Sequence, residues 1–159
     1  MCEYRTVDIG GFHTGAGCPG VSNPLNITGS ELFLRWIQWG AVAPILRTHC
    51  DHCERRIWMF PYFEHMRDAM RLRNALTPYL YTESRRFFDT GVAPLHPLYY
   101  DWPKDEKVYE TLVVEREYMF GHRILAQPVT KVSSARPAQA NMCFSVKINV
   151  LCATYVFIR

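Results

Sequence analysis

The stretch TGSELFLRWIQWGAVAPILRTH, from Thr28 to His49, decides the fold that we expect. Thr28 and Glu31 stand in the T-x-x-E order of a capping box, which predicts a helix that begins near Gly29. Glu31 and Arg35 are spaced to form an ion pair across one turn of this helix. Apolar side chains recur at helical spacing and predict one face for burial, made of Leu32, Phe33, Trp36, Ile37 and Trp39.

An apolar run follows this helix and predicts a short parallel strand. Gly40 is a typical helix end, and residues 41–46 carry no polar side chain, as in a strand covered on both faces. Pro44 cannot donate a ladder hydrogen bond, so we expect the paired part at Ile45 to Arg47. Reactive groups of α/β folds collect where parallel strands end. Arg47 and His49 are therefore candidates for contact with a ligand.

A second strand is predicted from Glu3 to Ile9, and it delivers Asp8 to its end. Gly10 and Gly11 follow as a turn, in a backbone conformation that only glycine adopts easily. Residues 12–27 are rich in glycine, proline and asparagine and are typical of a loop. This loop would lie over the same strand end as Asp8.

The chain then alternates again between loop and helix. Residues 48–61 are polar, aromatic and irregular, which indicates a second loop. A long helix is predicted from about Phe63 to Phe88, either kinked at Pro78 or interrupted there by a fresh helix that Thr77 and Pro78 begin. Strand, loop and helix thus occur twice in order, and this pattern predicts a parallel sheet with right-handed crossovers.

The pattern changes after Gly91. The segments expected there are an extended stretch at 92–100, a polar loop at 101–107, a helix at 109–120, a strand at 124–129, a linker at 130–140 and an alternating strand at 144–150. Residues 151–158 are almost wholly apolar and would need a partner sheet. This half is therefore expected to be richer in β-structure than the first.

Bulk composition excludes several protein classes. A chain of 159 residues with 48% hydrophobic residues is long and apolar enough for a globular core. The net charge of +3 is scattered, so we expect no nucleic acid partner and no membrane partner. The first residues do not resemble a signal peptide, and no run reaches the ~18 apolar residues of a membrane span. Six cysteines are too few for a disulfide framework at this length, and the compartment stays open.

Several motifs, in order, resemble glycoside hydrolase family 31, the retaining α-glucosidases and α-xylosidases. They are Asp8-Ile9-Gly10-Gly11-Phe12, the segments 31–41, 44–49 and 72–81, Pro97-Leu98-Tyr99-Tyr100, Tyr118-Met119-Phe120-Gly121 and the segment 124–129. The family's catalytic domain is a (β/α)8 TIM barrel, and a whole barrel takes about 250 residues. The resemblance therefore implies an α/β fold that holds the last two strand-helix units of a partial barrel, followed by the start of a β-rich C-terminal domain.

The resemblance also implies a division of the chain. Residues 1–90 would be the C-terminal part of the catalytic barrel, and residues 91–130 would open the β-rich domain that follows the barrel. Residues 131–159 would be a divergent tail without a family counterpart.

The catalytic groups of the family are not expected in this chain. Retaining glycosidases need two carboxyl groups about 5 to 5.5 Å apart. In the family these are aspartates of a W-x-D-M-N-E-like and a G-D-N-like motif, upstream of the segment that matches residues 8–12. No aspartate here has either context, in a set made of Asp8, Asp51, Asp68, Asp89, Asp101 and Asp105. We therefore assign no catalytic residue, and we expect the chain alone to be inactive.

The resemblance does carry over sugar-binding residues. His49 matches a histidine that hydrogen-bonds sugar hydroxyls, Phe12 matches an aromatic wall of the subsite, and Asp8 matches a strand-end aspartate that orients the polar cluster. The expected partner of the whole protein is thus a small-molecule carbohydrate. The structural alternatives are a histidine satisfied by its neighbours, an aromatic that packs in its own loop, and an aspartate that caps the turn.

A zinc site is the rival reading of the same region. Cys50 and Cys53 form a C-x-x-C, and His13, Cys18, His49 and His52 are further N or S ligands of the kind that tetrahedral zinc takes. A second C-x-x-C or H-x-x-H at the usual distance is missing. We assign no metal and no cofactor, and a non-catalytic carbohydrate-binding or zinc-binding piece is the alternative function.

Overall fold

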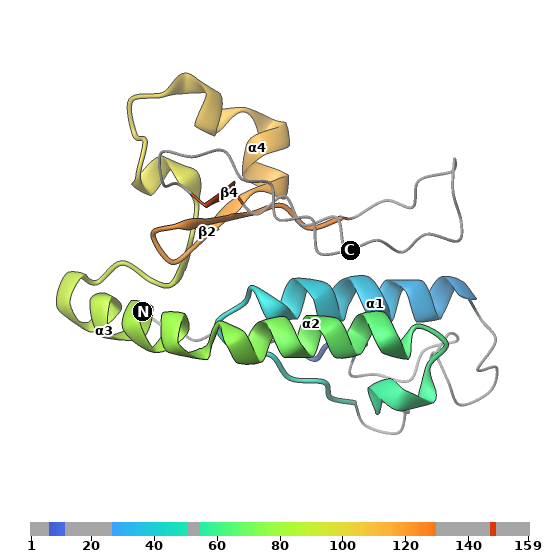
Figure 1. The fold of residues 1–159 in the computed structure, drawn as a ribbon. Coiled ribbons are helices and arrows are strands. Elements are labelled where there is room, and N and C mark those ends of the chain that lie inside the picture. Colours follow the sequence, from blue (N-terminus) through green and yellow to red (C-terminus); the bar gives the residue numbers. More distant parts are fainter. Residues whose placement is uncertain (1–6, 12–26, 51–54, 130–146, 149–159) are drawn as a thin grey trace. The chain divides into compact units, whose positions relative to one another are not determined.

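The computed structural model describes residues 7–11, 27–50, 55–129 and 147–148 (Figure 1). The chain divides into two compact units, one within residues 2–76 and the other within residues 77–159. Within the described residues, no helix is both long enough and apolar enough to cross a bilayer.

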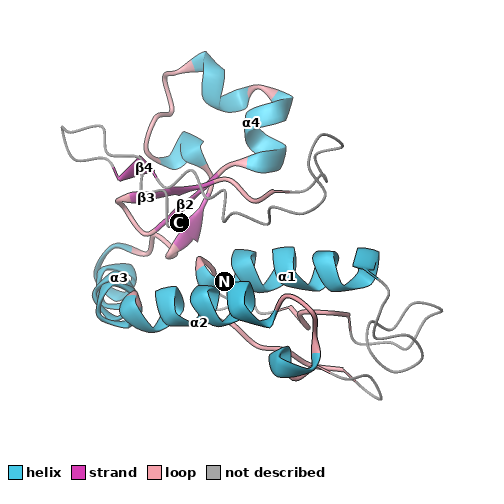
Figure 2. Ribbon diagram, turned by 45° about the vertical axis from the view of Figure 1, so that its right-hand side comes forward, coloured by secondary structure: helices cyan, strands magenta, loops and turns pink. Residues whose placement is uncertain are grey.

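Two long helices dominate the unit of residues 2–76. Helix α1 spans Ile27–Ala41 and helix α2 spans Phe63–Ala75, and the two lie side by side in Figures 1 and 2. A short 3-10 helix, Ile57–Met59, precedes α2 and packs against it. The core between these elements includes Phe33, whose ring lies 4.4 Å from that of Phe60.

Helix α1 forms where the sequence predicts a helix, but its start and its buried face differ from the prediction. The helix begins at Ile27, so Thr28 is a helical residue and not the N-cap of the expected box. The predicted ion pair of Glu31 with Arg35 is confirmed at 3.4 Å. Of the predicted buried face, Phe33 and Ile37 are fully buried, Trp36 and Trp39 are half-buried, and Leu32 is 61% exposed. The buried side chains of α1 follow spacings of three and four: Ser30, Phe33, Leu34, Ile37, Gln38 and Ala41.

Gly40 has a packing role rather than the expected role of ending the helix. It lies inside α1, one residue before the helix ends at Ala41, and it is not among the glycines with positive φ. A Cβ atom at Gly40 would lie 2.7 Å from Cδ1 of Ile9 and 3.1 Å from Cγ of Leu46. The missing side chain therefore lets both extended segments pack closely against the helix.

The two extended segments pair in parallel, as predicted, through one bridge within residues 7–11 and 45–50. Ile9 is opposite Thr48, and the Ile9 N–H donates to the carbonyl oxygen of Arg47 at 3.2 Å. The bridge residue Thr48 lies one residue beyond the paired part predicted at Ile45 to Arg47. The side chain of Ile9 is fully buried.

The long helix predicted over 63–88 is two helices. Helix α2 ends at Ala75, and α3 begins at Thr77 and runs to Thr90, with Pro78 in its first turn. The alternative of a fresh helix at Thr77 is therefore the correct one, because proline is tolerated in a first turn, where its missing N–H has no helical partner.

Arg73 near the end of α2 fixes the segment that follows α1. Its guanidinium donates to the carbonyl oxygen of Ala43 and, at 2.7 Å, to that of Pro44. Burial lowers the pKa of Arg73 from its ordinary value. These bonds satisfy backbone acceptors just before the extended residues 45–48 and hold that segment against α2.

The unit of residues 77–159 contains α3 and a small antiparallel sheet (Figure 2). The strands follow the order β1-β2-β3-β4, with bounds Leu95–His96, Tyr118–Phe120, Ile124–Ala126 and Lys147–Ile148. Two 3-10 helices (Leu98–Tyr100 and Glu106–Tyr109) and helix α4 (Thr111–Arg116) connect β1 to β2. The stretch predicted to be extended at 92–100 contains β1 but ends in a 3-10 helix at Leu98–Tyr100. The strand predicted at 124–129 forms over Ile124–Ala126, and β4 lies within the predicted strand 144–150.

The helix predicted over 109–120 is wrong in its second half. Helix α4 ends at Arg116, and Glu117 has extended backbone angles of φ −125° and ψ 141°. Met119 and Phe120 are buried in the sheet, where β2 pairs with both β1 and β3. Burial also raises the pKa of Tyr118 in the same strand. The expected linker at 130–140 and the apolar tail at 151–158 lie outside the described residues.

Candidate functional site

The candidate site is built on the bridge between Ile9 and Thr48. Ile9 packs toward Gly40 of α1, and successive side chains of an extended segment point to opposite faces. Asp8 and Arg47 are therefore on the face turned away from α1, and an ion pair between the Arg47 guanidinium and the Asp8 carboxylate joins them. Their side chains are 26% and 49% exposed, respectively, so the pair meets solvent.

His49 follows the bridge on the same face. It comes directly after Thr48 and lies two positions beyond Arg47, so the alternation of the segment directs its side chain to the face of Asp8 and Arg47. The residue is exposed. The structure thus brings two of the predicted site residues, Asp8 and His49, to one strand end on the face opposite the buried Ile9.

The glycine turn after Asp8 is held by an arginine that the sequence analysis missed. Gly10 and Gly11 have φ values of +98° and +87°, and the Gly11 N–H donates to the Asp8 carbonyl oxygen at 2.8 Å. Arg55 donates to the carbonyl oxygens of Gly10 and Gly11 at 2.5 and 2.9 Å.

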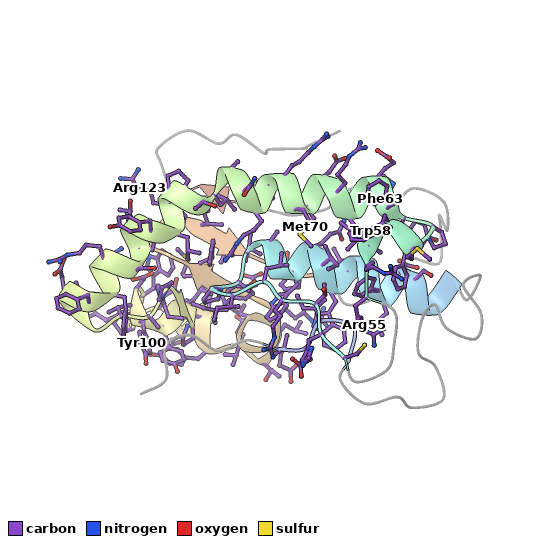
Figure 3. All side chains as sticks on the ribbon, turned by 90° about the horizontal axis from the view of Figure 1, so that it is seen from below. Arg55, Trp58, Phe63, Met70, Tyr100 and Arg123 are labelled. Atoms are coloured by element: carbon purple, nitrogen blue, oxygen red, sulfur yellow. The ribbon has the colours of Figure 1, made fainter. Side chains whose placement is uncertain are left out.

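Arg55 is itself firmly placed (Figure 3). It is 8% exposed, and its guanidinium carbon lies 5.9 Å from the centroid of the Phe33 ring on α1. A single arginine after an irregular polar loop forms no pattern in the sequence, and its partners lie 44 and 45 residues away. Arg55 therefore supports the site indirectly: it stabilises the turn that follows Asp8.

The remaining candidates lie outside the described residues. These are Phe12 of the proposed sugar subsite and His13, Cys18, His52 and Cys53 of the zinc alternative. Among the residues that the structure does describe, no group of three or more His, Cys, Asp and Glu side chains is placed to hold a metal ion.

The described side chains offer hydrogen bonds of complementary kinds. A carboxylate accepts, a guanidinium donates, and a neutral imidazole does both. Asp8, Arg47 and His49 supply one of each on a single solvent-facing strand end. Such a set suits a ligand rich in hydroxyl groups, which both donate and accept.

Comparison with known proteins agrees with this architecture. Residues 2–83 match the glycosyl hydrolases family 31 TIM-barrel domain, and residues 91–144 match the glycosyl hydrolase family 31 C-terminal domain. The chain is 37% identical over 129 residues to an alpha-xylosidase of Saccharolobus solfataricus, an alignment that covers 80% of this chain and 16% of that enzyme. It is also 37% identical over 140 residues to neutral alpha-glucosidase C of Mus musculus, covering 84% of this chain and 14% of the relative.

Solved structures give the same result. A family 31 alpha-xylosidase from a soil metagenome, complexed with xylose, superposes with a TM-score of 0.67 at 28% identity, covering 80% of this chain and 21% of that one. A xylosidase from Aspergillus niger superposes with a TM-score of 0.67 at 30% identity, covering 79% and 20%. The chain spans only a small part of these relatives, 16% and 14% of the length of the two curated enzymes. It belongs to glycoside hydrolase family 31 and comprises a partial TIM barrel followed by the start of the C-terminal domain.

Proposed function

We propose that this chain supplies one wall of the sugar-binding subsite of a glycosidase that hydrolyses terminal α-linked glucosides or xylosides with retention. The observation that supports this best is the parallel pairing of Ile9 with Thr48, because it brings the ends of two barrel segments together at Asp8 and His49. In TIM-barrel enzymes the active site lies at the C-terminal ends of the strands.

Each proposed residue has a role that fits its chemistry. His49 hydrogen-bonds sugar hydroxyls, because a neutral imidazole has one donor and one acceptor nitrogen. Phe12 presents an aromatic face to the apolar C–H side of the pyranose. Asp8 orients the polar cluster through its ion pair with Arg47.

The two reacting carboxylates belong elsewhere in this proposal. None of the six aspartates of the chain stands in a sequence context like that of the family's nucleophile or acid/base. The nucleophile and the acid/base would therefore come from earlier strands of the barrel, and residues 1–90 would contribute substrate contacts only.

Sugar binding tests the proposed wall. Xylose or glucose added to the chain at millimolar concentration is expected to shift the amide resonances of Gly10 and Gly11, which adjoin Asp8. His49→Ala is expected to weaken this binding about 5- to 10-fold, the loss typical of one or two hydrogen bonds. His65→Ala on α2 is the matched control and should bind as the unaltered chain does. Equal affinity in all three proteins would refute the role of His49.

Hydrolysis tests the second part of the proposal. The chain alone is expected to release no p-nitrophenol from p-nitrophenyl α-glucoside or α-xyloside, because bound sugar would meet no nucleophile and no general acid. The measurement is a long end-point assay at high protein concentration, with Asp8→Asn as a control for contaminating glycosidase. Turnover that a mechanism-based active-site label assigns to this chain would show that the reacting pair is present.

A further inference from the structure

A polar cluster around the buried Glu83 joins α3 to the turn between β2 and β3, within the unit of residues 77–159. Glu83 of α3 is 4% exposed, and its carboxylate accepts a hydrogen bond from Nδ1 of His122. Tyr79, one turn earlier on α3, donates to the Phe120 carbonyl oxygen at 2.9 Å and accepts from the Arg123 N–H at 3.1 Å. We call Tyr79, Glu83, Gly121, His122 and Arg123 the α3 clasp; of these, Arg123 is labelled in Figure 3.

The hydrogen bonds define the protonation state of His122. Nε of Arg123 lies 2.8 Å from Nε2 of His122, and a guanidinium nitrogen can only donate. Nε2 is therefore the acceptor, and the imidazole proton lies on Nδ1, which donates to Glu83. A neutral imidazole thus connects a buried carboxylate to a guanidinium. Arg86 is a charged group near the Glu83 carboxylate, with its Nη1 3.9 Å from Oε2.

The turn fits α3 because of Gly121. This glycine has a φ of +62°, and a Cβ atom there would lie 2.6 Å from Cγ and 2.7 Å from Cδ of Glu83. The close approach also buries the phenol of Tyr79, and this desolvation raises the pKa of Tyr79 to about 12. The Gly121 backbone, the Tyr79 phenol and the Glu83 side chain therefore lie so close together that a Cβ atom at Gly121 has no room.

The clasp crosses the boundary between the two family domains. Tyr79 and Glu83 fall within the segment that matches the TIM-barrel domain, whereas Gly121 and His122 fall within the segment that matches the C-terminal domain. By its contacts, α3 nevertheless belongs to the compact unit that contains the sheet. We propose that the α3 clasp is an interdomain lock, in which the buried Glu83 carboxylate, hydrogen-bonded to the half-buried His122, fixes α3 to the β2–β3 turn of the C-terminal domain. This inference does not depend on the proposed sugar subsite.

Amide hydrogen exchange of the whole 159-residue chain tests the lock. The Arg123 amide donates to Tyr79, so its exchange reports separation of the turn from α3. Glu83→Gln keeps the shape of the side chain but removes the charge, and it is expected to speed exchange of the Arg123 amide about tenfold. Glu115→Gln, on the exposed surface of α4, is the matched control and should leave this rate unchanged.

A double-mutant cycle distinguishes a lock from independent effects. His122→Ala should also speed exchange of the Arg123 amide. In the double variant with Glu83→Gln, the fold-increase in the exchange rate should be smaller than the product of the two single fold-increases. Independent of any variant, the side-chain nitrogen resonances of the neutral form of His122 should show its proton on Nδ1. Each of three results would overturn the proposal. They are a double variant whose rate increase equals the product of the single increases, a Glu83→Gln effect no larger than that of Glu115→Gln, and the Nε2–H tautomer of His122.

Discussion

Gly121→Ala is expected to lower the free energy of unfolding of the unit of residues 77–159 by about 3 to 5 kcal/mol. Two costs add at this position. An alanine at φ +62° costs about 1 to 2 kcal/mol relative to its preferred backbone region. The new methyl group would also overlap the buried Glu83 side chain and the Tyr79 hydroxyl, both of which are held by hydrogen bonds and cannot move aside freely.

Gly91→Ala is the matched control, because Gly91 has a similar φ of +76° and no heavy atom within 4 Å of an added Cβ. This variant should pay only the backbone cost of about 1 to 2 kcal/mol. Urea unfolding followed by hydrogen exchange of peptides from β2 and β3 measures both variants in the relevant unit. If Gly121→Ala and Gly91→Ala destabilise equally, the close approach of α3 to the turn has no energetic consequence.

Local patterns predict the existence of most elements but only part of the buried face of α1: Phe33 and Ile37 are buried as predicted, whereas Leu32 is exposed. The apolar residues of α1 cover more than one face, so spacing alone selected a stripe that includes Leu32, Trp36 and Trp39. In the structure, α2 and the Ile9 segment cover the neighbouring stripe, which contains the polar residues Ser30 and Gln38. Which face of α1 is buried depends on the elements that pack against it, and the sequence of the helix alone does not identify those elements.

The same limit explains the wrong assignment of residues 117–120. Their composition is compatible with a helix, and only pairing with β1 and β3 makes the extended form more stable. The Phe120 side chain is fully buried in that arrangement. Partners more than 20 residues upstream, at Leu95 and His96, decide the outcome. Strand propensity is strongly dependent on such context.

The candidate site was predictable in part for a physical reason. Apolar runs that end abruptly in Asp8 and in Arg47 to His49 identify strand ends directly from the sequence. The groups that support these ends were not predictable, because Arg55 and Arg73 contact backbone carbonyls 29 to 45 residues away. Every residue has a backbone carbonyl oxygen, so the identity of the residue that accepts from an arginine gives no clue to the pairing. The sequence therefore does not show which carbonyl an arginine will contact.

Arg55 leads to the second large effect: Gly10→Ala is expected to destabilise the unit of residues 2–76 by about 3 to 5 kcal/mol. A Cβ atom at Gly10 would lie 2.6 Å from Cδ and 2.9 Å from Cζ of Arg55. Arginine is flexible, but this one is 8% exposed and donates to two carbonyl oxygens of the turn. Moving it aside therefore loses both hydrogen bonds to the part-buried carbonyl oxygens of the turn, in addition to the strain of alanine at φ +98°.

The neighbouring Gly11 separates these contributions. Its φ of +87° is nearly as unfavourable for alanine, but no heavy atom lies within 4 Å of an added Cβ. Gly11→Ala should therefore show the backbone cost alone, about 1 to 3 kcal/mol, and the difference from Gly10→Ala measures the displacement of Arg55. Urea unfolding followed by exchange of α1 and α2 peptides gives both values. Equal destabilisation by the two variants would mean that Arg55 does not hold the turn, and the position of Asp8 would then depend on the bridge at Ile9, the Gly11 N–H and the ion pair with Arg47.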